Sequence, residues 1–143
     1  MTQIVNVIKN KKMNSKFYVS LEAARLLKEK GYNEQCDYCF YYDDYHDKWD
    51  FDSPYNLFDD DPMYYNNETI DDEMYSMPTK AEVIDWLESK GMCIIVFRRT
   101  IDNKVEWRYV IHGHTEIISG FQTRLEAKDA AIIKACKLLE NGN

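Results

Sequence analysis

The stretch that decides the fold runs from Met92 to Phe121 and reads MCIIVFRRTIDNKVEWRYVIHGHTEIISGF. β-Branched and aromatic residues fill Met92–Arg98, which predicts a strand. Apolar and polar residues then alternate over Val105–Ile111, as they do in a strand with one face in water. Ile101–Lys104 supplies turn residues for a hairpin between these two strands, and Thr115–Phe121 is a third strand. The stretch therefore predicts a three-stranded antiparallel meander.

One helix is predicted before this meander in the sequence and another after it. Upstream, Thr79 and Glu82 have the spacing of a capping box at the start of a helix. Downstream, Thr123 and Glu126 repeat that spacing, and the helix that follows runs to about Glu140. The order helix–three strands–helix predicts an α+β layer with both helices on one face of the sheet.

One more helix is predicted near the N-terminus. Ser20 is a candidate N-cap, apolar residues recur at helical spacing over Leu21–Leu27, and Gly31 ends the helix. Two short strands are also expected, at Gln3–Ile8 and Phe17–Val19.

The formal charge of −7 is concentrated in the middle of the chain. Residues 37–76 hold thirteen acids and a single base, Lys48, for a net charge of −12, whereas residues 1–36 carry +4 and residues 77–143 carry +1. The middle segment also holds eight of the eleven tyrosines. Disordered acidic tails are poor in aromatic residues, so we expect an ordered but irregular lobe.

These boundaries divide a single domain into three parts. Residues 1–36 form an N-terminal strand and helix segment, residues 37–76 an acidic Tyr/Asp-rich lobe packed on the domain, and residues 77–143 an αβββα core. A chain of 143 residues is long enough to bury a core without metals or disulfides.

Composition argues against a membrane-spanning protein, a secreted disulfide-rich protein and a general nucleic-acid binder. The longest apolar run, Met92–Phe97, has six residues, far below the roughly 20 that a membrane-spanning helix needs. Four cysteines without a secretory signal predict reduced thiols and a cytoplasmic location. The negative charge argues against a general nucleic-acid binder, because contact with phosphates needs a positive surface.

Two clusters could hold a metal ion. Cys36 and Cys39 form a CxxC pair, but a zinc site needs two further ligands, and the remaining Cys and His residues lack regular spacing. We therefore expect structural thiols. The aspartates from Asp43 to Asp52 lack the spacing and the glycine of an EF-hand, so a solvated acidic face is expected rather than a calcium or magnesium site.

Motifs for catalysis are missing from the sequence. It contains no G-x-S-x-G, Walker loop, dinucleotide-binding glycine loop or H-E-x-x-H, and only five glycines. The sequence therefore predicts no enzyme, no catalytic residue and no cofactor.

The C-terminal half resembles a double-stranded RNA-binding domain in the order of its elements. Its last helix opens with Arg124 and Lys128 around Ala127, which is similar to the lysine-rich second helix of that family. The loop Thr100–Lys104 lacks the histidine-bearing turn that the family places in the minor groove. The resemblance implies a nucleic-acid-binding module for duplex RNA or DNA. The basic residues expected to serve it are Arg98, Arg99, Lys104, Arg108, Arg124 and Lys128.

The whole chain also resembles a group of short, uncharacterised proteins of bacterial prophages and mobile elements. The resemblance rests on Val19-Ser20-Leu21-Glu22, Leu27-Lys28-Glu29-Lys30-Gly31, Cys36-Asp37-Tyr38, Met77-Pro78-Thr79, Val83, Trp86-Leu87 and Glu126-Ala127. It implies a bacterial cytosol and an accessory role, and it implies no activity.

The leading hypothesis is a non-enzymatic protein-interaction module that acts through the acidic aromatic lobe. Such a surface steers basic partners, and a DNA-mimicking inhibitor is a sharper form of the same hypothesis. The residues predicted to bind the partner are Asp43, Asp44, Asp47, Trp49, Asp50, Asp52, Asp59, Asp60 and Asp61. Two alternatives stay open: nucleic-acid binding by the αβββα part, and self-association through tyrosines.

Overall fold

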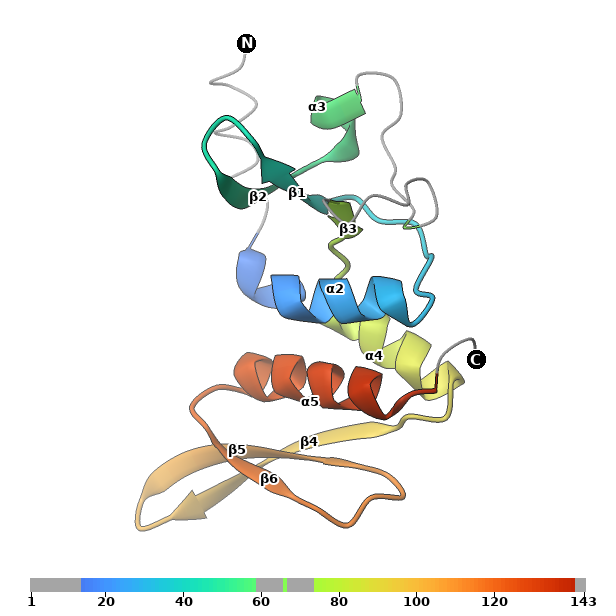
Figure 1. Ribbon diagram of the computed structural model, residues 1–143. Helices are drawn as coiled ribbons and strands as arrows, with labels where there is room; N and C mark the ends of the chain where they lie inside the picture. The colour runs from blue at the N-terminus through green and yellow to red at the C-terminus, as the bar shows by residue number, and fades with distance from the viewer. Residues whose placement is uncertain (1–13, 59–65, 67–73, 141–143) are drawn as a thin grey trace.

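The computed structural model describes residues 14–58, 66 and 74–140 (Figure 1). In chain order the elements are η1 (Ser15–Phe17), α2 (Leu21–Glu29), β1 (Cys39–Asp43), β2 (Lys48–Asp52), α3 (Pro54–Phe58), β3 (Met74–Ser76), α4 (Lys80–Ser89), β4 (Ile94–Ile101), β5 (Lys104–Ile111), β6 (Ile118–Phe121) and α5 (Arg124–Leu138). They form two antiparallel three-stranded sheets with helices between them, which confirms the α+β class.

The C-terminal sheet is the predicted meander, with the order β4-β5-β6. β4 and β5 pair from Ile94↔Ile111 to Ile101↔Lys104. Asp102 and Asn103 between them have φ angles of 51° and 64°, the left-handed backbone that a two-residue hairpin turn requires. This confirms the predicted strands and their turn. β6 is shorter than expected and pairs with β5 across an irregularity.

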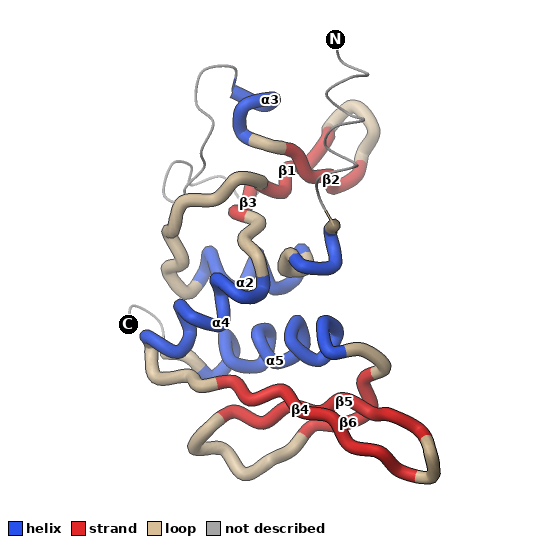
Figure 2. Tube along the Cα trace, turned by 180° about the vertical axis from the view of Figure 1, so that it is seen from behind, coloured by secondary structure: helices blue, strands red, loops and turns tan. Residues whose placement is uncertain are grey.

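The helices form two layers rather than one. α5 packs directly on the sheet, whereas α4 packs mainly on α5 and also contacts β4 (Figures 1 and 2). α2 also packs on α5, so α5 lies between the sheet and most of the other two helices, and α4 reaches the sheet at β4. α5 is therefore buried on more than one side, with Ala127, Ala131, Ile132, Ala135 and Cys136 all covered.

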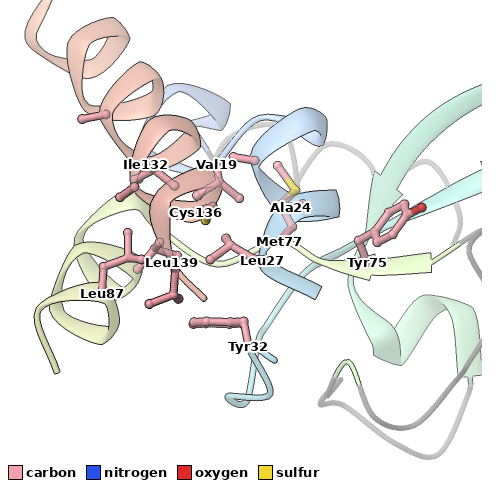
Figure 3. Packing of buried hydrophobic residues seen from close by; sticks show 14 of the residues in the cluster. Val19, Ala24, Leu27, Tyr32, Tyr75, Met77, Leu87, Ile132, Cys136 and Leu139 are labelled. Atoms are coloured by element: carbon pink, nitrogen blue, oxygen red, sulfur yellow. The ribbon is translucent and has the colours of Figure 1, made fainter. Parts of the chain in front are cut away.

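The core lies where the three long helices meet. Figure 3 shows Ile132 and Cys136 of α5, with Leu139 at its C-cap, beside Leu27 of α2 and Leu87 of α4. The same cluster of buried residues continues outward and takes in part of each sheet. Both sheets are therefore attached to one shared core.

Residues 37–76 contain a second sheet that the sequence did not predict, with the order β2-β1-β3. The register runs from Cys39↔Asp52 to Asp43↔Lys48 on one side of β1, and β1 pairs with β3 on the other. The expectation of an irregular lobe is therefore wrong for its described part. The strands were missed because aromatic residues occur on both faces of β1, which hides the alternation between buried and wet positions.

The predicted helix starts are present with one change. Ser20 and Thr79 cap their helices, and Glu82 completes the capping box at Thr79. Thr123 caps α5, but the Glu126 carboxylate accepts a hydrogen bond from the Gln122 N–H and not from the Thr123 N–H, as a capping box requires. The predicted strand Phe17–Val19 is reduced to a single bridge between Tyr18 and Thr79, and Gln3–Ile8 lies outside the described residues.

Candidate functional site

The hairpin of β1 and β2 carries its aspartates on one face. Alternation along the strands places Tyr41 and Asp43 of β1 on the same side as Lys48, Asp50 and Asp52 of β2. Tyr41 lies directly opposite Asp50, and Asp43 lies opposite Lys48. Burial raises the pKa of the Tyr41 phenol, and the carboxylates of Asp50, Asp52 and Asp43 raise it further. The three carboxylates therefore surround one phenol. We call Tyr41, Asp43, Asp50 and Asp52 the acidic face.

The turn of this hairpin is held by Asp43. Its Oδ1 accepts hydrogen bonds from the N–H groups of Tyr45 and His46 at 3.1 and 3.2 Å, and its Oδ2 lies 2.6 Å from Nδ1 of His46. The hydrogen bond with the His46 ring lowers the pKa of Asp43. Tyr45, 91% exposed, packs its ring edge-on against His46 with centroids 4.9 Å apart. The tip therefore presents an exposed aromatic side chain on an ordered turn, with Asp44 and Asp47 beside it.

Trp49 lies on the opposite side of the same hairpin. Its ring packs against Tyr42 and Tyr75, with centroid distances of 5.6 and 5.4 Å. The Arg25 guanidinium of α2 lies 5.6 Å from the ring centroids of both Trp49 and Tyr75. Trp49, predicted to bind a partner together with the aspartates, thus packs against Arg25 of α2 and does not share the acidic face.

The side chain of Asn66 ties the second sheet to the rest of the molecule. It is 2% exposed; its Nδ2 donates to the Tyr32 carbonyl at 2.7 Å, and its Oδ1 accepts from the Ser76 N–H at 2.8 Å. This buried amide satisfies two backbone groups that water cannot reach. It therefore helps to fix the orientation of the hairpin relative to the core.

The two cysteines of the CxxC pair, Cys36 and Cys39, are buried structural thiols. The Cys36 Sγ donates to the Glu34 carbonyl at 3.5 Å, and the Cys39 Sγ donates to the Asp52 carbonyl at 3.8 Å. Burial raises the pKa of Cys36 to about 12, which suppresses the reactive thiolate. Within residues 14–58, 66 and 74–140, no three Cys, His, Asp or Glu side chains gather as metal ligands would.

The six basic residues predicted to bind nucleic acid do not form one patch. Arg98 and Arg99 are neighbours in β4, and side chains alternate along a strand, so the two point to opposite faces of the sheet. Ile94 and Val96 face α5, and Arg98 lies on their side. Arg99, Lys104 and Arg108 therefore share the face turned away from α5. The remaining two, Arg124 and Lys128, belong to the first turns of α5 on the other side.

A groove of about 520 Å³ separates the start of α2 from α5 and the second sheet. The residues that line it include Phe40, Phe51, Phe121 and Lys80. The Lys80 ammonium is buried, which lowers its pKa, and it donates to the Lys16 carbonyl at 2.7 Å. The groove thus offers an apolar wall, and its buried ammonium is already bonded within the chain.

Sequence reasoning missed Tyr45 and Tyr41 as parts of the site. It could not rank eight tyrosines by exposure, although the spacing of Asp43 and His46 is typical of an aspartate that holds a turn. The predicted site residues Asp59, Asp60 and Asp61 lie outside the described residues.

No protein-family model matches the chain, and neither curated proteins nor solved structures gave a match. Among the helices of the described segments, none is long and apolar enough to cross a membrane.

Proposed function

We propose that the protein is a non-enzymatic interaction module of the cytoplasm that binds a basic protein partner through its acidic hairpin. The binding surface consists of the acidic face, the turn residues Asp44 and Asp47, and Tyr45 at the tip. The observation that carries this proposal is the placement of Asp43, Asp50 and Asp52 around Tyr41 on one side of an ordered hairpin.

Electrostatics and the exposed aromatic residue have separate roles in this proposal. A cluster of carboxylates raises the encounter rate with a positively charged partner, and this effect weakens as the salt concentration rises. Tyr45 is an aromatic anchor, a residue type that interfaces favour at their energetic centre. The turn is held by hydrogen bonds to Asp43, so binding sacrifices little conformational freedom.

The proposal is tested by neutralising the hairpin without changing its shape. The variant combines Asp44→Asn, Asp47→Asn and Asp50→Asn, since an amide is close in size to a carboxylate and Asn tolerates the positive φ of residue 47. The matched control, Asp85→Asn with Glu88→Gln and Asp102→Asn, makes the same change in charge at exposed positions elsewhere.

Partner capture from bacterial lysate is compared at about 50 and 200 mM salt. We expect the wild type and the control variant to retain the same protein at low salt, and the hairpin variant to lose it. Release by added duplex DNA would support the DNA-mimicking form. Equal capture by the hairpin variant and the wild type contradicts the proposal, as does a partner held equally at both salt concentrations.

A further inference from the structure

The C-terminal sheet has one covered face and one uncovered face. Ile94, Val96, Tyr109 and Ile111 pack in the core under α5, so the residues between them point away from the helix. Figures 1 and 2 show that none of the described elements lies over that side. We call this surface the outer sheet face. It comprises Ile95, Phe97, Arg99 and Ile101 of β4 with Lys104, Glu106, Arg108 and Val110 of β5.

Apolar and cationic side chains are mixed on the outer sheet face. Ile95 and Ile101 are 45% and 40% exposed, although bulky aliphatic residues are usually buried. The Arg108 guanidinium lies 5.4 Å from the centre of the Phe97 ring, and its Nε donates to the Ser119 Oγ at 2.9 Å. An aromatic ring and a guanidinium plane are thus held next to each other on an open sheet.

The charge of this face is positive, although the protein as a whole is acidic. Arg99, Lys104 and Arg108 contribute three cations, and Glu106 is the one acid among the eight residues. Glu106 forms an ion pair with Arg99 at 3.6 Å, which leaves the face with a net charge of +2. The net positive charge is therefore available to an anionic ligand.

We propose that the outer sheet face binds single-stranded nucleic acid. Unpaired bases stack on aromatic rings and on arginine planes, which the Phe97–Arg108 pair supplies, and phosphates pair with Arg99 and Lys104. A single strand fits because its bases are free to stack on a sheet, whereas the bases of a duplex are already stacked. The proposed ligand differs from the duplex that the resemblance to double-stranded RNA-binding domains implies.

The acidic hairpin does not prevent this binding. It lies at the opposite end of the molecule, with α5 and the layer of α2 and α4 between the two surfaces (Figure 1). Each helix layer is about 10 Å thick, so the separation exceeds the Debye length of about 8 Å at physiological salt. The two surfaces therefore act on their ligands almost independently.

The test uses fluorescence anisotropy with labelled oligo-dT and oligo-U of about 12 nucleotides, on the full chain. With two cations paired to phosphates, the plot of log affinity against log salt should have a slope of about −1.4. Arg99→Ala should weaken binding and reduce the slope by about 0.7. The matched control is Arg98→Ala, which removes the same charge from the adjacent residue on the other face, and it should leave affinity unchanged.

Stacking is tested separately at Phe97. Phe97→Ala should weaken binding roughly ten-fold or more at every salt concentration, with no change in slope, whereas Phe97→Tyr should retain it. Thermal unfolding of each variant verifies that the sheet is intact. Asp44→Asn with Asp47→Asn and Asp50→Asn should not alter this binding, so its outcome is separate from that of the proposed protein-binding function.

Three results would overturn the inference. The first is an absence of binding to either oligonucleotide at about 50 mM salt. The second is an equal loss of affinity in the Arg98 and Arg99 variants, which would indicate diffuse attraction. The third is a concentration-dependent mass in light scattering that Phe97→Ala abolishes, which would assign the face to contact between copies of the chain.

Discussion

The two three-stranded sheets differ in how their strands find each other. In the C-terminal sheet, strands that are neighbours in space are neighbours in sequence, joined by short turns, and α5 follows immediately to cover them. In the second sheet, β1 pairs with β2 across a short turn but also with β3, which follows only after α3 and a long segment. Local sequence patterns therefore determine the first sheet, whereas the second depends on long-range pairing and on contacts with the core.

Ile132→Ala should have the largest effect because it affects the core that both sheets share. Ile132 is fully buried in α5, and its truncation should lower the free energy of unfolding by about 2–5 kcal/mol. Urea unfolding followed by far-UV and near-UV circular dichroism should show one coincident transition. The exposed Lys134→Ala of the same helix should change stability by less than about 0.5 kcal/mol. Two separate transitions would show that the second sheet folds independently.

Asn66→Ala should have the next largest effect, and it concerns the second sheet. The change leaves the Tyr32 carbonyl and the Ser76 N–H without the partner they have now, at a cost of about 1–3 kcal/mol. Urea unfolding measures the loss. Asn56→Ala is the control, since that amide makes an exposed bond to Asp52. Equal effects of the two variants would mean that Asn66 is not the anchor of the second sheet.

Much of the C-terminal half could be predicted because each element has its own local pattern. Thr79 and Glu82 start a helix through their side chains, and Asp102 and Asn103 suit the left-handed backbone of the hairpin turn. These residues act on backbone groups within four positions, so the sequence alone is sufficient to place them.

The second sheet and its site could not be predicted in the same way. The sequence located the acidic segment, but which side of the sheet each residue faces depends on pairing between β1 and β3 and on contact with α2. Trp49 illustrates this, because its ring is covered by Arg25, a residue from a separate helix. The buried Asn66 gives no local pattern at all, since its partners Tyr32 and Ser76 are distant in sequence.

Arg25→Ala should have a smaller effect and tests the contact between α2 and the aromatic side of the hairpin. Its guanidinium faces Trp49 and Tyr75, and an exposed cation–π contact contributes about 0.5–1 kcal/mol. Urea unfolding should show this loss and tryptophan emission should shift, while Arg25→Lys should retain only part of the stability. If the loss disappears at about 1 M salt, simple charge attraction to the acidic lobe explains the contact better than stacking.

The smallest effect concerns pH and the turn that presents Tyr45. Hydrogen bonds from His46 and Tyr45 lower the pKa of Asp43, so the folded hairpin favours the ionised carboxylate. The resulting stabilisation is complete above the usual aspartate pKa of about 3.9 and is lost as the pH falls through the lower folded value. NMR titration of the Asp43 carboxyl carbon should show that lowered pKa, and amide exchange at Tyr45 should accelerate over the same pH range.

Asp43→Asn provides the control for this titration. It retains an oxygen that can accept from the backbone N–H groups, but it cannot ionise, so the acid-linked acceleration at Tyr45 should vanish. A pKa of Asp43 at or above the usual value would contradict the role of the turn. With the lowered value, the carboxylate of Asp43 stays charged throughout the physiological pH range, so protein binding through the acidic face should not vary with pH through this residue.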